Sequence, residues 1–455
     1  MELMRPLSES LAGIESRLER LPLLSWHWMA LGIVGIAQAV EAIDSLAASF
    51  ALPVLIKLWM LTKTEAGILI SSMYAGQMLG AASFGWLSDR LGRLRLLRWS
   101  TAALVVLGLI AASAWNYPSF VAFRFLQGIA FGAELLLAAA YIAELAAGSF
   151  RGRLVFGLNV IFSAGVILAS VIATYVVPTF GWRWVFVIAA VGSLPFFLFG
   201  RRLPESPRWL ACRGRFTEAN SVVEEIERRA ISAGKALPDP DAVTFEAAPT
   251  GPLSRWRDLF EPEFRVRTLL LWVMVLCVGT IGISLISWLP TFFQLTYHIS
   301  LKSTLAMSTV TFTAPLLASV FGSVVVDRLP RKYCLLAGFA GVSIAAFAMW
   351  RFIGVAPISV AVALSFSTIL FQVFLLFTLY LVMVEFYPTR LRGIGSGAAR
   401  MWLGVSAIIG PTGAGLVSTH WGVTGTLGAL FVTALIGLLA ILGLIAAWPR
   451  QSPGL

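Results

Sequence analysis

The chain of 455 residues is 58% hydrophobic and only 13% charged, with a mean hydropathy of +0.85. A soluble domain of this size cannot bury so many apolar side chains, so lipid must cover part of them and the soluble classes are excluded. The net charge of +11 could indicate a nucleic-acid-binding protein, but the placement of the cations indicates membrane topology. If the N-terminus is cytoplasmic, about 27 of the 34 Lys and Arg residues lie on the cytoplasmic side, which is the positive-inside pattern.

Residues 1–28 are predicted to form a cytoplasmic tail. This tail lacks an apolar run followed by a small-residue cleavage site, so we expect no cleaved signal peptide. A short amphipathic helix at the inner membrane surface and a plain solvated tail are both compatible with its sequence. The helix is suggested by apolar residues at helical spacing, namely Leu7, Leu11, Ile14, Leu18 and Leu21.

Twelve apolar stretches are long enough to cross a bilayer as helices. They lie near residues 29–55, 66–87, 96–114, 118–143, 154–177, 183–200, 268–292, 303–326, 333–352, 357–384, 394–417 and 424–447. The predicted fold class is therefore an all-α membrane protein with twelve transmembrane helices. We assign residues 29–200 and 268–448 to an N-terminal and a C-terminal six-helix bundle.

Internal repeats support two pseudo-symmetric halves, because three pairs of motifs recur in the same order at nearly the same separation, about 240 residues. Leu52-Pro53 recurs as Leu289-Pro290, Asp89 to Arg93 as Asp327 to Arg331, and Glu144 with Arg151 as Glu385 with Arg392. Between the halves, residues 201–267 are polar and rich in proline, so we predict a cytoplasmic linker containing one amphipathic helix, Phe216–Ala230. Residues 449–455 form the C-terminal tail.

Five ionisable residues fall inside predicted spans, where each costs about 2.5–3.5 kcal/mol on insertion scales. They are Glu41 and Asp44 on the first helix, Arg124 and Glu134 on the fourth, and Arg400 on the eleventh. Three carboxyls against two guanidiniums leave a negative charge, so at least one carboxyl is expected to hold a proton. We predict proton coupling by Asp44, Glu41 and Glu134, with a structural hydrogen-bonded pair as the alternative for the first two.

The loop Gly85 to Arg93 resembles the signature loop of the major facilitator superfamily, and Arg124 to Gly128 resembles its fourth-helix motif. Glu41 to Asp44, Gly132 to Leu135 and Pro204 to Leu210 resemble the metabolite:proton symporters, which include niacin and aromatic-acid transporters. The resemblance implies two six-helix bundles around a central cavity, worked by alternating access. Aromatic-acid relatives have Asp at both ends of the first-helix acid motif, whereas Glu41 stands first here.

The same resemblance indicates an anion anchor, because Arg400 matches an eleventh-helix arginine of those relatives. A guanidinium offers a planar fork to a carboxylate, so we predict substrate binding by Arg400, with a structural ion pair as the alternative. Arg124 and Gln127 are further candidates for substrate contact. Aromatic and amide side chains that could line the cavity are Tyr74, Gln77, Trp288, Gln294, Gln372 and Tyr380, although most aromatic residues of a membrane protein only pack or face lipid.

The charged loop residues are predicted to form salt bridges between helices that hold one access state closed, with a topology signal as the alternative. They are Asp89, Arg90, Arg93, Asp327, Arg328 and Arg331, together with Glu144, Arg151, Glu385 and Arg392.

Chemistry on the substrate is not expected. The sequence shows neither a nucleophile paired with a base nor metal-ligand spacing, and its three cysteines are scattered. We therefore predict no enzyme, no cofactor and no metal site.

The favoured function is proton-coupled uptake of a small organic anion, an aromatic or heteroaromatic carboxylate such as nicotinate. The expected partners are that carboxylate, protons and the bilayer, with no nucleic acid, and the expected state is a monomer in a bacterial inner membrane with both termini cytoplasmic. A porter of sugars or other neutral metabolites, an efflux transporter and a transceptor remain alternatives. Hexose porters fit less well because the paired glutamines of their seventh helix are missing from Val278 to Ser284.

Overall fold

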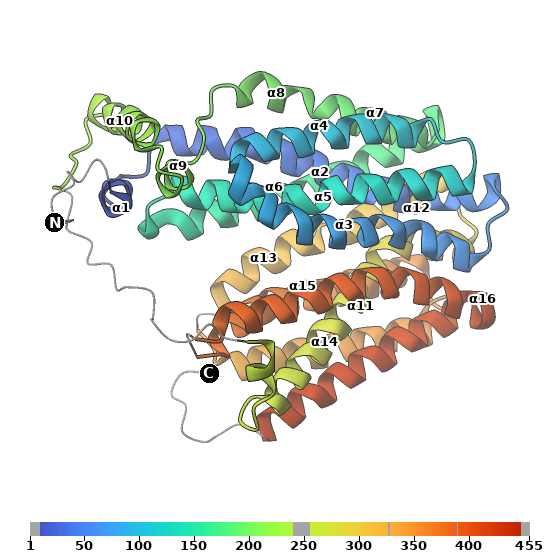
Figure 1. The fold of residues 1–455 in the computed structure, drawn as a ribbon. Coiled ribbons are helices and arrows are strands. Elements are labelled where there is room, and N and C mark those ends of the chain that lie inside the picture. Colours follow the sequence, from blue (N-terminus) through green and yellow to red (C-terminus); the bar gives the residue numbers. More distant parts are fainter. Residues whose placement is uncertain (1–9, 240–254, 326–327, 389, 447–455) are drawn as a thin grey trace.

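The computed structural model describes residues 10–239, 255–325, 328–388 and 390–446. The N-terminal bundle contains α2 (Ser25–Leu58), α3 (Lys63–Leu91), α4 (Arg93–Ala112), α5 (Tyr117–Leu145), α6 (Gly148–Phe180), α7 (Arg183–Gly192) and α8 (Leu194–Gly200). The C-terminal bundle contains α11 (Arg265–Tyr297), α12 (Leu301–Thr311), α13 (Ala314–Val325), α14 (Arg331–Phe352), α15 (Ile358–Glu385) and α16 (Arg392–Ala446). Figure 1 shows the two bundles lying against each other.

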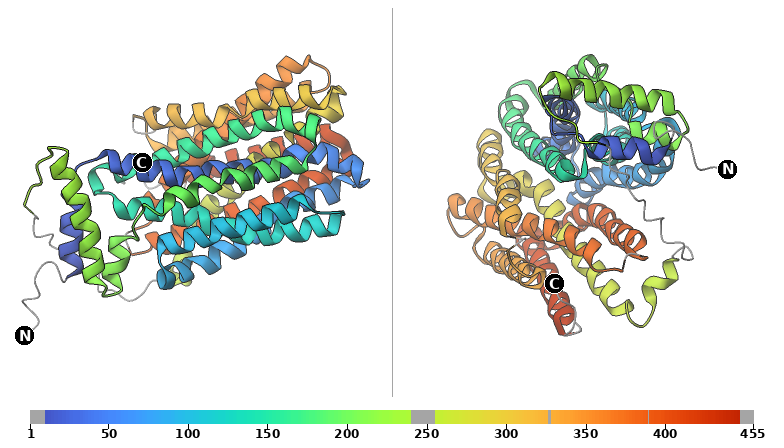
Figure 2. Two further views of the ribbon diagram at one scale, coloured as in Figure 1. Left: turned by 90° about the horizontal axis from the view of Figure 1, so that it is seen from above. Right: turned by 90° about the vertical axis from the view of Figure 1, so that its left-hand side faces the viewer.

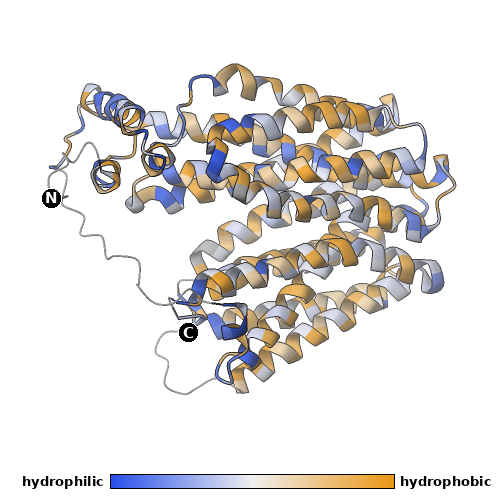
Figure 3. Ribbon diagram, in the orientation of Figure 1, coloured by the Kyte–Doolittle hydropathy of each residue, from blue (hydrophilic) through white to orange (hydrophobic). Residues whose placement is uncertain are grey.

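In the part of the chain that the structure describes, these helices make twelve passes. α7 and α8 form one pass, as do α12 and α13. With 55 residues, α16 would be about 80 Å long as one straight helix, far more than a bilayer needs. It contains two passes, because Gly422 with φ 68° interrupts the helical backbone. The prediction of an all-α protein with twelve spans is confirmed, and apolar residues follow most of each helix (Figure 3).

Glycines set the position of α5 against α3. A Cβ atom on Gly76 would lie 2.0 Å from the carbonyl oxygen of Phe125, and one on Gly128 would lie 2.0 Å from that of Met73. Only residues without a side chain allow two helix backbones to approach so closely. This packing fixes the helix that carries Arg124, Gln127 and Glu134.

The bundles contact each other mainly toward one end. We call the end with α9 (Pro207–Cys212) and α10 (Phe216–Ser232) the linker end, and the opposite end the hairpin end. On the hairpin side, Lys63 Nζ donates to the carbonyl of Ser418 at 2.9 Å, and Ser71 Oγ donates to that of Ile408 at 2.6 Å. The ribbons separate toward the linker end (Figure 1).

The N-terminal segment forms a helix, α1 (Leu11–Glu19), which lies with α10 across the linker end of the N-terminal bundle (Figure 2). Ile14 and Leu18 are fully buried in a cluster that includes residues of α9 and α10. The predicted short helix is present, but its apolar stripe covers protein, and the alternative of a plain solvated tail was wrong. Leu7 lies outside the described residues.

The boundaries of the linker differ slightly from those predicted. The first spanning helix begins at Ser25, and the seventh span begins at Arg265. The predicted helix over Phe216–Ala230 is confirmed as α10, which continues to Ser232. A short 3-10 helix, η2 (Trp256–Phe260), precedes α11.

Candidate functional site

A buried ion pair joins α2 and α5 near the middle of the N-terminal bundle. Arg124 is only 1% exposed, and its Nη1 atom lies 3.3 Å from Asp44 Oδ2. The same nitrogen donates to Gln127 Oε1 at 2.6 Å, and the guanidinium lies over the ring of Phe186, 5.4 Å from its centroid. Gln127 is thus held by Arg124, one turn along the same helix. Removing one member of such a pair leaves the other charge buried without compensation.

Two further carboxyls lie beside this pair. Gln38 donates its side-chain amide to Glu41, and Thr101 Oγ1 lies 3.3 Å from Glu134 Oε1. Glu41 and Glu134 are 2% and 1% exposed. Together with Asp44 and Thr101 they line a narrow cavity with room for about one water molecule.

The buried charges do not balance. Fully ionised, three carboxylates face the one guanidinium of Arg124. The expected second guanidinium does not join them, because the Arg400 side chain is exposed. The imbalance is therefore larger than the sequence suggested, and protons must neutralise part of this set.

Arg400 lies on α16 beyond the contacts that hold the two bundles together. Along α3 and α16 the contacts run from Lys63 with Ser418, through Ser71 with Ile408, to Met78, which lies 3.8 Å from the Cβ position of Gly404. Arg400 precedes Gly404 by one turn on the same face, nearer to the start of α16.

The guanidinium of Arg400 lies 5.4 Å from the centroid of the Tyr380 ring. Over the described ranges, no Asp or Glu side chain forms an ion pair with it. The arrangement leaves the donors of a planar cation available to an anion beside an aromatic ring.

The other predicted cavity residues divide into two groups. Trp288 is fully buried and donates its indole N–H to the carbonyl of Pro411 at 3.0 Å, and Gln372 donates to that of Val278 at 3.2 Å. These two side chains brace helices of the C-terminal bundle. Tyr74, Gln77 and Gln294 are partly buried on α3 and α11.

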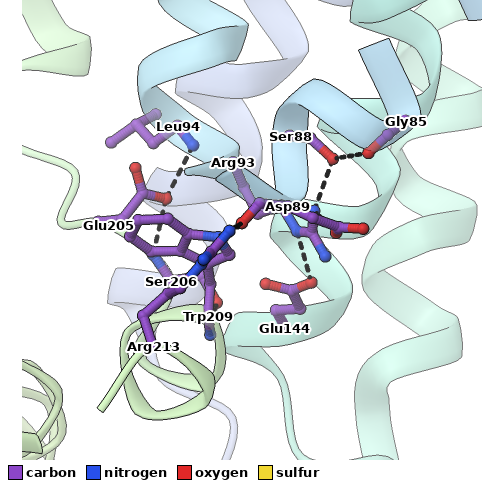
Figure 4. Close-up of polar contacts among 10 residues, drawn as sticks. All are labelled: Gly85, Ser88, Asp89, Arg93, Leu94, Glu144, Glu205, Ser206, Trp209 and Arg213. Atoms are coloured by element: carbon purple, nitrogen blue, oxygen red, sulfur yellow. Dashed lines mark hydrogen bonds and ion pairs between the residues drawn. The ribbon is translucent and has the colours of Figure 1, made fainter. Parts of the chain in front are cut away.

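The signature loop is held within the N-terminal bundle and by the linker (Figure 4). Arg93 pairs with Asp89 at 2.6 Å and with Glu144 at 3.0 Å. Trp209 of α9 donates its indole N–H to the carbonyl of Asp89 at 2.8 Å, and Glu205 accepts from the backbone N–H of Leu94 at 2.9 Å.

The C-terminal half repeats part of this pattern. Arg331 pairs with Glu385 at 3.3 Å, again within one bundle, while Arg90, Arg328 and Arg392 are exposed. Asp327 lies outside the described residues. These pairs link helices as expected; whether they hold an access state closed stays a prediction.

Arg151 has a partner that the sequence did not suggest. Glu19 of α1 pairs with Arg151 at 2.7 Å and with Arg208 at 2.8 Å, and it accepts from the backbone N–H of Gly148. Partial burial acts to raise the pKa of Glu19, but the Gly148 N–H and the guanidiniums of Arg208 and Arg151 outweigh it and hold the pKa below its ordinary value. The sequence motif Pro204 to Leu210 was the available signal for the roles of Glu205, Arg208 and Trp209.

Comparisons with known proteins agree with this architecture. The niacin transporter NiaP of Acinetobacter baylyi is 29% identical over 409 residues, 89% of each chain. The putative metabolite transport protein YyaJ of Bacillus subtilis is 30% identical and covers 90% of this chain and 89% of its own. The xylose transporter XylE of Escherichia coli, in a partially occluded inward-open conformation, superposes with a TM-score of 0.73 at 19% identity, over 95% of this chain and all of XylE. The profile of the sugar (and other) transporter family matches residues 34–446, so the chain belongs to this family of major facilitator transporters and is an integral, multi-pass membrane transporter of small molecules, not an enzyme.

Proposed function

We propose that this protein carries a small organic anion, an aromatic or heteroaromatic carboxylate such as nicotinate, into the cell together with protons. The observation that carries the proposal is Arg400, an exposed cation in a spanning helix with no carboxylate partner among the described residues. A carboxylate bound there would receive charge-assisted hydrogen bonds and lie beside the ring of Tyr380.

Proton coupling follows from the ion pair in the other bundle. While Asp44 is ionised it neutralises Arg124. A proton on Asp44 removes that neutralisation and makes Arg124 a second cation for an anionic substrate. Substrate and proton then favour each other's binding, which is the thermodynamic basis of symport.

The relatives support both parts of the proposal. A niacin transporter shares 29% of its residues over most of the chain, and nicotinate is the carboxylate form of niacin. The D-xylose-proton symporter has the same fold, with a TM-score of 0.73, and combines this fold with proton symport.

The charge distribution supports an orientation with the linker end in the cytoplasm. Most Lys and Arg residues lie in the tails, the linker and the loops of that end. We infer a monomer in a bacterial inner membrane with both termini inside. The contacts between the bundles at the hairpin end fit the inward-facing half of an alternating-access cycle.

A neutral-sugar porter is the second candidate, since the matching family includes sugar transporters. Uptake of radiolabelled nicotinate, benzoate, 4-hydroxybenzoate and glucose into proteoliposomes, with an inward proton gradient imposed or collapsed, separates the two. We expect gradient-dependent carboxylate uptake that is lost in Asp44→Asn and Arg400→Ala. The control Arg351→Ala removes an exposed cation at the other end of the C-terminal bundle and should transport normally. Gradient-independent glucose uptake that persists in Asp44→Asn would favour the sugar porter.

A further inference from the structure

Hydrogen-bond counting around Thr101 favours a proton on Glu134. Thr101 Oγ1 lies 2.8 Å from the carbonyl oxygen of Leu97 and 3.3 Å from Glu134 Oε1. A threonine hydroxyl has one hydrogen, and a carbonyl oxygen can only accept. The shorter contact therefore uses the hydroxyl hydrogen, and the longer contact becomes a full hydrogen bond when the Glu134 carboxyl carries a proton and donates it to Thr101 Oγ1.

The surroundings of Glu134 favour the same protonation state. The charged groups around its cavity are Glu41 and Asp44 on α2, and Arg124 lies on its own helix, α5. α4 and α7 line the cavity with neutral side chains, and Ser193 adds a hydroxyl at the end of α7. Arg124 is paired with Asp44, so this cluster has no further cation to neutralise an ionised Glu134.

Three carboxyl oxygens of the cavity have no hydrogen-bond partner among the residues that the structure describes: Glu41 Oε1, Asp44 Oδ1 and Glu134 Oε2. Buried polar atoms are normally satisfied, by protein or by ordered water. The cavity has room for about one water, and a single water can hydrogen-bond to two or three such oxygens.

We propose that Glu134 is a resident proton carrier and that one water in this cavity connects it to Asp44. This proposal rests on the proton coupling proposed above, and it names Glu134 as the group inside the protein that exchanges a proton with Asp44. When the carboxyl turns its O–H from Thr101 toward the cavity, the proton passes to the water, and a proton of the water passes to Asp44 Oδ1. Glu134 becomes the carboxylate, Asp44 becomes the neutral acid, and Arg124 loses its counter-charge.

The positions along the helices place Glu134 on the linker-end side of the Asp44–Arg124 pair. α2 begins at the linker end, so Glu41 lies about one turn closer to that end than Asp44. α5 runs the other way, and Glu134 lies about 15 Å closer to the linker end than Arg124 along the helix. The carrier therefore lies between the Asp44–Arg124 pair and the linker end. During uptake the same transfer runs in reverse: once Glu134 has lost its proton, Asp44 passes a proton through the water to Glu134, and the proton leaves toward the linker end.

Infrared spectroscopy of the full-length protein in a bilayer tests the protonation directly and needs no substrate. We expect a carboxylic-acid C=O band at neutral pH that Glu134→Gln removes and that Glu41→Gln and Asp44→Asn retain. Glu134→Asp should shift the band, which keeps the test open if the glutamine variant folds poorly. A wild-type spectrum without such a band, or no loss of carboxylic-acid intensity in Glu134→Gln relative to wild type, would overturn the proposal, even if gradient-driven transport by Asp44 were established.

Transport then separates a proton carrier from a structural residue. Exchange of nicotinate across the membrane requires no net proton movement, whereas a pH gradient of one unit drives about tenfold accumulation through one coupled proton. In Glu134→Gln we expect exchange to continue while accumulation falls about tenfold, to the level without a gradient. Equal loss of both activities would indicate a structural role. If wild type accumulates no nicotinate under any gradient, the proposed substrate is wrong. The infrared spectra would still show whether Glu134 carries a proton.

Discussion

The two bundles share a backbone plan but differ in buried charge. The N-terminal bundle buries Arg124 and three carboxyls in its spanning helices, whereas no Asp, Glu, Lys or Arg side chain is buried in the described part of the C-terminal bundle. The C-terminal bundle instead presents Arg400 as an exposed cation at the end of the interbundle contacts. Pseudo-symmetry of the helices therefore leaves the buried charge asymmetric, and the proposed function assigns titration to the first bundle and anion binding to the second.

The largest effect is expected from breaking the buried pair. Arg124→Leu leaves Asp44 buried without a partner and should lower the free energy of unfolding by about 3–5 kcal/mol, measured by denaturant unfolding in detergent. The double variant with Asp44→Asn removes the orphaned charge and should regain most of that loss. Arg400→Leu, the matched change in the other bundle, should alter stability by less than about 0.5 kcal/mol. Similar losses in both single variants would contradict the asymmetry.

Arg400 should instead control affinity. Arg400→Ala removes charge-assisted hydrogen bonds to a carboxylate, so nicotinate should bind about 10- to 100-fold more weakly, measured by calorimetry on the purified protein. Arg400→Lys keeps the positive charge but lacks the planar guanidinium, so its affinity for nicotinate should lie between those of wild type and Arg400→Ala. Unchanged affinity in Arg400→Ala, with Arg351→Ala as control, would remove the C-terminal bundle from anion recognition.

The contacts between the bundles at the hairpin end depend on a glycine. A Cβ atom on Gly67 would lie 2.5 Å from the carbonyl oxygen of Pro411, so Gly67→Val should force α3 and α16 apart. Spin labels at the exposed positions Met60 and Trp421 should report longer distances in this variant. Gly413→Val is the control, because a Cβ there meets nothing within 4 Å. Equal spin-label distances in both variants would show that the contact between α3 and α16 tolerates the added valine side chain.

The smallest effect concerns α1 and pH. The pKa of Glu19 is lowered in the folded protein, so its stabilising pairs are complete above the ordinary carboxyl pKa of 4.5 and are lost as the pH falls through the lowered value. The pairs are partly exposed and should contribute about 0.2–1 kcal/mol. The protection of residues 11–19 against hydrogen exchange, taken relative to the intrinsic exchange rate at each pH, should therefore fall at acid pH in wild type and already at neutral pH in Glu19→Gln. Glu218→Gln, which removes only a pair with Arg215 at the start of α10, is the control, and an equal effect there would exclude a specific role for Glu19.

Much of the fold was predictable because spanning helices follow from length and hydropathy. Even the break between the last two spans, placed between residues 417 and 424, agrees with the interruption at Gly422. The docking of α1 was not predictable, because an apolar stripe such as Ile14 and Leu18 looks the same whether it faces lipid or protein.

The candidate site was predictable in residue type but not in environment. Asp44 and Arg124 could be listed as costly intramembrane charges, but their pairing across 80 residues of sequence needed the packing of α2 and α5. The sequence did not indicate on which face of α16 Arg400 lies, so the exposure of its side chain was not predicted. Trp288 gave no sign that its indole N–H would bind the carbonyl of Pro411.

Proton uptake on substrate binding tests the division between the bundles most directly. Nicotinate is added to purified protein in weak buffer with a pH indicator. We predict that wild type takes up protons as nicotinate binds, that Asp44→Asn binds nicotinate without proton uptake, and that Arg400→Ala shows neither at the same concentration. Full proton uptake in Asp44→Asn, or full binding in Arg400→Ala, would contradict the assignment of titration to the N-terminal bundle and of anion binding to the C-terminal bundle.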